Sequence, residues 1–401
     1  MLQDTSCSES LNKMTQLPAI ATATIMLLNI SCSDQQSPLL SFHWKQAAEL
    51  PIMKEGHRSI GFAGPVAGLH HDKLIFAGGA NFPKGMPWLG GEKKYYDDIY
   101  VFDKNNNNDI VHYGSFKLPS AIAYAAVCTT PFGVLYAGGE NEHGISDKVY
   151  LLQWDITTDA AVTMELPSLP TAVTNAAATL SGNTIYIAGG EMPSGPSSQF
   201  LSLDLDEPAA GWKQLPAIPR AVSHTVLNSI DHNGRRLIFL AGGRSRQADG
   251  ISELYRSLYE FDLRKNQWTE KKSLPYPLSA GTGLAIDSDH LVLFGGDKGE
   301  VFHQVEELIV AIGKEKDETK KMQLNNQKMN VQSNHPGFSR EVLMYSVKSD
   351  EWSKIDSILF DSPVTTTAIK WDDVIIIPSG EIRAGVRSPF ILSAKISTPG
   401  K

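Results

Sequence analysis

Cysteine is scarce in this chain, and its placement excludes several kinds of protein. Only three cysteines occur among 401 residues, at Cys7, Cys32 and Cys128, and none is spaced as a zinc or redox pair. Cys128 lies within an apolar run, which is typical of a small buried hydrophobic residue. The sequence therefore indicates neither a disulfide framework nor a cysteine-based metal centre.

Positive charge is also in short supply. The 36 lysines and arginines are outnumbered by 44 aspartates and glutamates, giving a net charge of -8. This balance argues against a nucleic-acid partner, although a local arginine cluster could still bind an anionic small molecule.

Several catalytic signatures are missing from the sequence. It has no Gly-x-Ser-x-Gly elbow, no His-Glu-x-x-His pair and no phosphate-binding glycine loop. His70-His71-Asp72 falls at an expected strand-to-strand turn, far from the expected site, so it is assigned no metal. These chemistries therefore find little support in the sequence, and no metal ligands are assigned.

The N-terminal segment differs from the rest of the chain. Lys13 precedes an apolar run at 17–30, which is too short to span a membrane and fits the hydrophobic part of an export signal. Cys32 follows directly, as in bacterial lipoprotein signals. We expect residues 1–40 to be a leader and linker, the protein to reach the periplasm or cell envelope, and a lipidated Cys32 to be its membrane attachment. The alternative is an uncleaved leader.

An internal repeat organises the remainder of the chain. A β-branched or aromatic run ending in a small dipeptide recurs, mostly at intervals of about 50 to 60 residues, close to the kelch period. The copies are Leu74 to Gly79, Val134 to Gly139, Ile185 to Gly190, Ile238 to Gly243, Val292 to Gly296 and Ile375 to Gly380. Six copies predict a six-bladed kelch-type β-propeller over 41–398, with four strands in each blade.

The residues around each copy agree with this interpretation. A strand of small residues precedes the copy, as at 174–179, and an aromatic-aspartate strand follows it, as at 100–103. A further strand often begins with tryptophan, as at Trp212 and Trp268. Inner strands crowd the propeller axis and need small side chains, whereas outer strands have room for large ones. The diglycine permits positive φ and close backbone approach.

The two ends of the repeat region complement each other. The sixth copy is followed by only one further strand, so its blade lacks an outer strand. Residues 42–50 carry a tryptophan, Trp44, before Leu50-Pro51, but no blade precedes them. They should complete the blade that begins at 363, which closes the ring and removes an exposed edge.

Two intervals are longer than the repeat requires. The excess at 297–338 contains an apolar-acidic stretch and a charged, Asn/Gln-rich run, and we interpret it as an inserted helix or lid. An insertion without function is the alternative. A second insertion at 81–96 carries Trp88.

The loops that follow the dipeptides should meet at one mouth of the propeller. They carry several carboxylates together with arginines, and guanidinium groups suit a carboxylate-bearing ligand. Glu381 and Arg387 share one of these loops and are the candidate catalytic pair. Candidate ligand contacts from loop placement are Arg58, Asn81, Arg220 and Arg244. Repeated hydrogen bonding within the loops, and ordinary salt bridges between them, are the alternatives.

Three stretches resemble the bacterial N-acetylneuraminate epimerases, which are sialic acid mutarotases built on kelch repeats. Gly61-Phe62-Ala63-Gly64 with 74–80, Gly380-Glu381 followed by Arg387, and the position of the long insertion are all similar to that family. The likeness extends over 42–397. The blade with Glu381 stands last here and is split across the chain ends, so the chain is similar to a cyclically permuted branch. Ser379 stands where the family has asparagine.

The resemblance implies a specific activity. The protein would interconvert the α and β anomers of N-acetylneuraminate without a cofactor, with Glu381 moving protons and Arg387 holding the sugar carboxylate or polarising the reacting oxygens. Two alternatives stay open: a non-catalytic carbohydrate- or protein-binding propeller of the cell envelope, and an enzyme for another acidic sugar. The sequence also leaves the oligomeric state open, a homodimer included.

Overall fold

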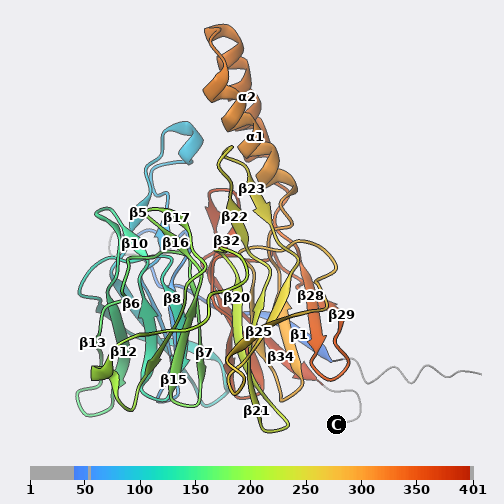
Figure 1. Cartoon of the computed structure of the whole chain (residues 1–401). Helices are drawn as coiled ribbons and strands as arrows, with labels where there is room; N and C mark the ends of the chain where they lie inside the picture. The colour runs from blue at the N-terminus through green and yellow to red at the C-terminus, as the bar shows by residue number, and fades with distance from the viewer. Residues whose placement is uncertain (1–39, 53–55, 398–401) are drawn as a thin grey trace, which may run out of the picture. The chain divides into compact units, whose positions relative to one another are not determined.

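The computed structural model describes residues 40–52 and 56–397. The N-terminal unit Met1–Ser37, and with it the predicted export signal and Cys32, lies outside these residues. Within the described residues, six four-stranded antiparallel sheets follow one another as the blades of a propeller (Figure 1). The predicted fold class is confirmed.

In each of the first five blades, the four strands lie side by side in the order in which they occur along the chain. The first blade contains β2 (Val66–His70), β3 (Lys73–Ala77), β6 (Asp98–Lys104) and β7 (Ile110–Lys117). The second contains β8 (Ala126–Thr130), β9 (Gly133–Ala137), β12 (Val149–Asp155) and β13 (Ala160–Leu166). The third contains β14 (Ala177–Ser181), β15 (Thr184–Ala188), β18 (Phe200–Asp204) and β19 (Lys213–Gln214), with the short helix η2 (Pro208–Ala210). The fourth contains β20 (Val226–His232), β21 (Arg235–Ala241), β24 (Leu258–Asp262) and β25 (Gln267–Lys271). The fifth contains β26 (Thr282–Ala285), β27 (His290–Phe294), β28 (Glu341–Ser346) and β29 (Glu351–Ser357).

The sixth blade joins the two ends of the propeller, as the sequence predicts. It contains β30 (Ile369–Trp371), β31 (Val374–Pro378), β34 (Phe390–Ser397) and, as its outer strand, β1 (Ser41–Glu49). β1 runs antiparallel to β34 from the Ser41–Ser397 pair to the Glu49–Phe390 pair. Phe42 and Trp44 of β1 are buried against Phe294 of the fifth blade, so this strand also ties two blades together.

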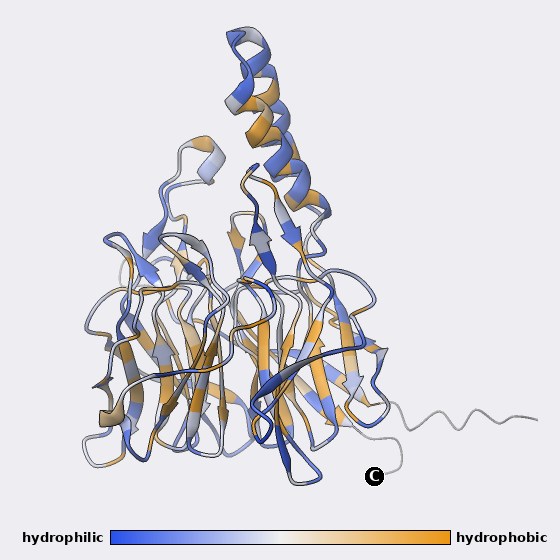
Figure 2. Ribbon diagram, in the orientation of Figure 1, coloured by the Kyte–Doolittle hydropathy of each residue, from blue (hydrophilic) through white to orange (hydrophobic). Residues whose placement is uncertain are grey.

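The blade strands bury their apolar residues between neighbouring blades. Figure 2 shows these residues concentrated along the strands, whereas much of the helical insertion is hydrophilic. The outer-strand tryptophans bridge blades through hydrogen bonds: Trp212 Nε1 donates to the Pro167 carbonyl at 2.8 Å and Trp268 Nε1 to the Pro216 carbonyl at 3.0 Å. These contacts explain why tryptophan recurs at the start of the fourth strands.

The diglycines lie where adjacent blades approach most closely. Gly138 has a φ of +67°, and a Cβ there would lie 2.2 Å from the carbonyl oxygen of Val173. The N–H of the next residue, Gly139, donates to that same carbonyl at 2.8 Å. Any larger residue at Gly138 would therefore force the blades apart.

Short hairpins extend the loops after the second strand of five blades, as far as the described residues show. They are β4–β5 (Ala80–Asn81 and Lys94–Tyr95), β10–β11 (Glu140–Asn141 and Gly144–Ile145), β16–β17 (Glu191–Met192 and Gly195–Pro196), β22–β23 (Arg244–Arg246 and Ser252–Leu254) and β32–β33 (Glu381–Arg383 and Val386–Arg387). In the fifth blade, this place is taken by α1 (Glu300–Lys314) and α2 (Glu318–Ser333). Figure 1 shows hairpins and helices on the same side of the blades.

The insertion predicted at 297–338 thus consists of two packed helices, and the one at 81–96 contains the short helix η1 (Pro87–Leu89). No helix among the described residues combines the length and apolar character needed to cross a membrane.

Candidate active site

A closed ring of backbone hydrogen bonds connects the six blades at the start of their inner strands. Each ring residue donates its N–H to the carbonyl of the ring residue in the preceding blade. The shortest of these bonds, from Gly64 to Thr365, is 2.7 Å, and the longest, from His224 to Asn175, is 3.1 Å. The ring residues are Gly64, Tyr124, Asn175, His224, Ala280 and Thr365, all with φ between +51° and +63°. Non-glycine residues rarely adopt this conformation, and such strain is commonly found at functional sites.

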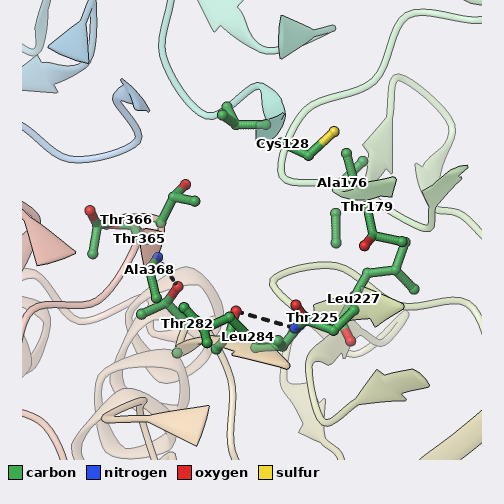
Figure 3. Close-up of a pocket in the computed structure, with 18 of the residues that line it drawn as sticks. Cys128, Ala176, Thr179, Thr225, Leu227, Thr282, Leu284, Thr365, Thr366 and Ala368 are labelled. Carbon is green, nitrogen blue, oxygen red and sulfur yellow. Dashed lines mark hydrogen bonds between the residues drawn. The ribbon is translucent and has the colours of Figure 1, made fainter. Parts of the chain in front are cut away.

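Two cavities share five of the six residues of this backbone ring, all but Gly64. One of about 440 Å³ runs between the inner strands, where it is lined mostly by small residues and threonines such as Thr179 and Thr282 (Figure 3). Cys128 of β8 lines it too, and burial raises the pKa of its thiol to about 12, so the thiol is protonated and unreactive at neutral pH. The Thr282 hydroxyl accepts the N–H of Ala368 at 2.6 Å, so it already has a partner in the fold.

The second cavity, of about 490 Å³, lies on the hairpin side of the ring and carries most of the charge. Ionisable groups from all six blades line it: Lys93, Tyr124, Glu140, Glu191, His224, Arg244, Asp297, His335, Glu381 and Arg387. Apolar residues from the two insertions complete its wall: Phe82, Pro87, Trp88, Val301, Phe302, Val305 and Phe338. We call this the mouth cavity.

The six-fold register explains how the charges reach the mouth cavity. The first residue after each dipeptide forms an isolated bridge with the residue that precedes the backbone ring, as in the Val364–Glu381 and Thr174–Glu191 bridges. The equivalent positions, in blade order, are Ala80, Glu140, Glu191, Arg244, Asp297 and Glu381. Positions three blades apart face each other across the axis of a six-bladed ring, so Glu191 lies opposite Glu381.

The predicted catalytic pair meets inside the mouth cavity. Glu381 and Arg387 are cross-strand partners on β32 and β33, and Arg387 Nη2 lies 3.4 Å from Glu381 Oε2. The other carboxylate oxygen, Oε1, accepts the N–H of Gly385 at 2.8 Å, which fixes the carboxylate within its own hairpin. Ser379, before this hairpin, bonds the backbone of Phe62 and Ser388 through its hydroxyl and so anchors the sixth blade to the first.

Arg387 is buried but incompletely bonded. Its side chain is 4% exposed, and its Nε and Nη1 have no hydrogen-bond partner among the described residues. Its guanidinium lies over the Phe82 ring, 4.7 Å from the centroid. A buried donor without an acceptor lowers the stability of a fold. The two unpartnered nitrogens of Arg387 are therefore suited to bind a ligand with anionic oxygens.

Arg244 provides a second guanidinium in the mouth cavity. It lies over the Phe302 ring of α1 at 4.3 Å, and its Nη2 is 3.2 Å from His224 Nε2. Burial lowers the Arg244 pKa, which the surrounding carboxylates, beginning with Glu191, oppose. Burial, and then the charge of Arg244, hold the pKa of His224 well below its ordinary value, so this imidazole is neutral at pH 7.

Three predicted contacts do not line the mouth cavity. Arg58 is 83% exposed and pairs with Glu49 at 3.6 Å, while Arg220 is half exposed, lies over the Tyr255 ring and pairs with Glu253 at 3.7 Å. Asn81 is fully buried: its side chain donates to the Gly61 carbonyl and accepts from the Tyr96 hydroxyl. Arg58 and Arg220 are thus held in exposed ion pairs, and Asn81 is hydrogen-bonded inside the first blade. The structure does not bring these three side chains to the mouth cavity.

Sequence reasoning missed three side chains on the backbone ring, Tyr124, Asn175 and His224. Their signal is the repeat itself, because each follows the bridge residue Ala123, Thr174 or Ser223 in the same register. The carboxylates that follow the dipeptides also have different partners. Glu140 pairs with Lys93 at 3.1 Å, Glu191 accepts from the Ser223 hydroxyl at 2.8 Å, and Glu381 accepts from its own hairpin.

Fold and site together define a six-bladed kelch-type propeller whose mouth cavity is lined by carboxylate and guanidinium groups. The family model described as "NANM: N-acetylneuraminate epimerase" matches residues 166–400, more than half of the chain. The chain therefore belongs to the N-acetylneuraminate epimerase family, which confirms the resemblance seen in the sequence.

Individual relatives agree with this assignment. The chain is 24% identical to an N-acetylneuraminate epimerase of Pasteurella multocida (strain Pm70) over 61% of this chain and 62% of the relative. It is 37% identical to one of Brucella suis over 28% of this chain and 30% of the relative. The chain thus spans less than two thirds of the length of these relatives.

A solved structure titled "Structure of YjhT" has the same fold. The TM-score is 0.57 at 12% sequence identity, covering 88% of this chain and 100% of the other. The cyclic permutation of the blades stays a prediction.

Proposed function

We propose that this protein is an isomerase that interconverts the α and β anomers of N-acetylneuraminate by opening and closing the sugar ring. Membership of the N-acetylneuraminate epimerase family and the names of the relatives support this reaction. The observation that carries it is the Glu381–Arg387 pair, in which a carboxylate lies beside a buried guanidinium with two unpartnered nitrogens within the described part of the chain.

Glu381 and Arg387 have different roles in ring opening, and Glu381 transfers the proton. Glu381 accepts the proton of the anomeric hydroxyl, the C2–ring oxygen bond breaks, and the proton is delivered to the departing ring oxygen, leaving a ketone at C2. Rotation about C2–C3 turns the other face of the ketone toward the ring hydroxyl. The same steps in reverse then close the other anomer and return Glu381 to its carboxylate form.

Arg387 holds the substrate for these steps. Its Nε and Nη1 donate to the sugar carboxylate, which gives these buried donors the acceptors that the described residues do not provide. Because the carboxylate is bonded to C2, this contact brings the anomeric oxygens next to Glu381. The guanidinium also stabilises negative charge that develops on oxygen as the ring opens.

The helical insertion at 297–338 acts as a cover for the bound sugar in this proposal. α1 contributes Val301, Phe302 and Val305 to the mouth cavity, and Gln332, His335 and Phe338 come from the end of α2 and the segment after it. A cover over the bound sugar excludes water from the charged groups and strengthens their interactions.

Anomer exchange observed by NMR tests the proposal. Freshly released α-N-acetylneuraminate is mixed with protein, and the α and β signals are followed against buffer alone. The wild type should accelerate exchange. Glu381→Gln and Arg387→Ala should each lose at least about 100-fold of the acceleration, the usual contribution of a general acid–base group or a charge-stabilising donor.

Arg58→Ala is the matched control, because Arg58 is exposed and outside the mouth cavity. Its activity should equal that of the wild type. Binding of the sugar without acceleration would reject the mutarotase in favour of a carbohydrate-binding propeller. Acceleration with a different acidic sugar alone would keep the site and change the substrate.

Export to the periplasm or cell envelope, with a lipidated Cys32, is also part of the proposal. It is supported by the sequence of residues 1–40 alone. Metabolic labelling with a radioactive fatty acid should mark the wild type and not Cys32→Ser; equal labelling would reject lipidation. A homodimer is tested by light scattering on the purified protein.

A further inference from the structure

Four side chains of the third and fourth blades form a continuous hydrogen-bonded chain in the mouth cavity. Arg244 Nη2 lies 3.2 Å from His224 Nε2, His224 Nδ1 lies 3.0 Å from Ser223 Oγ, and Ser223 Oγ lies 2.8 Å from Glu191 Oε1. Glu191 occupies the position opposite Glu381 in the six-fold register. This chain, which we call the Arg244 relay, is separate from the Glu381–Arg387 hairpin.

The chemistry of the groups fixes the direction of every hydrogen bond. A guanidinium only donates, so His224 Nε2 must be the acceptor. The neutral imidazole then carries its hydrogen on Nδ1 and donates it to the Ser223 hydroxyl. That hydroxyl in turn donates to the Glu191 carboxylate, which only accepts. One tautomer of His224 therefore satisfies the whole relay.

The relay is not needed for blade assembly. Ser223 is 1% exposed, yet the equivalent residues of the first two blades, Ala63 and Ala123, have no hydroxyl. His224 stands on the backbone ring at a φ of +53°, where Asn175 serves in the preceding blade. The ring bonds use main-chain atoms, so they require neither the serine hydroxyl nor the imidazole; the hydroxyl has one long main-chain contact, to the Arg244 carbonyl at 3.4 Å.

We propose that Glu191, Ser223 and His224 are positioning residues that hold the guanidinium of Arg244 in the mouth cavity, where it contacts a neutral oxygen of the sugar while Arg387 contacts its carboxylate. The identity of the ligand rests on the proposed function. The relay bonds one edge of the guanidinium, and the Phe302 ring lies 4.3 Å from it.

Charge decides which oxygen Arg244 contacts. Its positive charge is already opposed by Glu191, Asp297, Glu306 and Glu381. A monocarboxylate sugar has a single anionic group, which the incompletely bonded Arg387 takes up. An amide carbonyl or hydroxyl oxygen of the same sugar is therefore the acceptor left for Arg244.

Acid should undo this arrangement. Protonated His224 has no acceptor at Nε2 and repels Arg244, although Glu191, with Oε1 at 3.6 Å from Nδ1, would partly stabilise the added charge. Because burial keeps the pKa of His224 well below 6.5, the relay should stay intact from pH 8 through 6.5 and fail only at lower pH.

Three variants test the relay through KM and kcat for anomer exchange. His224→Asn keeps a residue suited to positive φ but cannot reach Arg244, whereas His224→Gln places an amide oxygen near the position of Nε2. Ser223→Ala leaves His224 in place but removes the acceptor of its Nδ1 hydrogen, the link to Glu191 and the 3.4 Å contact with the Arg244 carbonyl. We expect KM to rise about tenfold in His224→Asn and about threefold in Ser223→Ala, because hydrogen bonds to charged groups are lost or weakened. kcat should stay within about twofold, and His224→Gln should restore KM to within about twofold.

The pH profile adds a readout that a merely structural role would not move. KM of the wild type should rise in acid more steeply than that of His224→Gln, since glutamine does not titrate. Unchanged KM in His224→Asn, a fall in kcat alone, or parallel profiles for the wild type and His224→Gln would each overturn the positioning role.

An imidazole ¹⁵N spectrum of the free wild type separates this proposal from the proposed function. It should show His224 neutral at pH 7 with the hydrogen on Nδ1. A hydrogen on Nε2, or a charged imidazole, would refute the relay even if the enzyme is active. The expected tautomer without anomer exchange would instead refute the mutarotase and leave the relay as the anchor of Arg244 for another ligand.

Discussion

Replacing Glu381 and Arg387 together should abolish activity without destabilising the protein. The double variant Glu381→Gln/Arg387→Met removes both charges and keeps side chains of similar length. Two buried nitrogens of Arg387 lack partners among the described residues, and each such group costs about 1–3 kcal/mol. The ion pair that is lost contributes little net stability, because its N–O distance is 3.4 Å and the attraction is offset by the desolvation of two side chains that are only 4% and 20% exposed.

The remaining contributions are smaller and partly cancel. The cation–π contact with Phe82 is worth about 0.5–2 kcal/mol, and methionine recovers part of it through a sulfur–aromatic contact of about 0.3–1.5 kcal/mol. The net expectation is a protein as stable as the wild type or more stable by about 1–3 kcal/mol, as found when buried ion pairs are replaced by apolar groups.

Urea unfolding, followed by tryptophan fluorescence, and the NMR exchange assay provide the two readouts. A loss of more than about 2 kcal/mol in the double variant would show that the pair serves the fold and would refute the reasoning. Arg235→Met is the matched control. Arg235 donates to Glu260 at 3.1 Å and to Asp262 at 2.9 Å, and both carboxylates are under 10% exposed, so this variant should be destabilised and remain active.

Three further predictions concern the framework that holds the site. Phe42→Ala in β1 should lower the free energy of unfolding in urea by about 3–5 kcal/mol, because Phe42 is 5% exposed and packs edge-on against Phe294. A loss below about 1 kcal/mol would mean that β1 contributes little to ring closure. Gly138→Ala should lower the midpoint of thermal unfolding strongly, since its Cβ would lie 2.2 Å from a carbonyl oxygen. Gly313→Ala in α1 is the control, because its Cβ meets nothing within 4 Å, and it should leave the midpoint unchanged or slightly higher. Equal effects of the two variants would contradict the argument that the blades approach too closely for a Cβ at Gly138. Hydrogen bonds from Lys354, Tyr276 and Lys298 lower the pKa of Glu341 to about 2, so its contribution to stability is complete above about pH 4.5 and is lost as the pH falls toward 2. The unfolding free energy of the wild type should therefore fall more steeply over that range than that of Glu341→Gln. Identical slopes would contradict the assignment.

The propeller could be predicted from the sequence because each blade repeats the same local requirements. Glycine is needed where a Cβ would meet a neighbouring carbonyl, as at Gly138, and tryptophan where a side chain bridges to the next blade, as at Trp268. Such requirements recur at a fixed period and are visible in a single chain. Trp44, an outer-strand tryptophan without a preceding blade, was enough to predict that β1 closes the ring.

The candidate site was predictable only where its partners share one loop. Glu381 and Arg387 are six positions apart in the sequence, and hairpin pairing brings them together whatever the other blades do. Arg58 and Arg220 come from loops of similar composition, but their side chains turn to nearby carboxylates at the surface.

The sequence by itself determined the ring, its closure and the acidic-basic hairpin, because these follow from periodicity and from residues close together in the chain. Only the tertiary structure decided which groups face the mouth cavity and which are bonded away. The Arg244 relay joins residues from different blades, and the partners of a side chain there depend on how blades with a common register converge on one axis. Burial then sets the charge states, as it keeps His224 neutral beside Arg244.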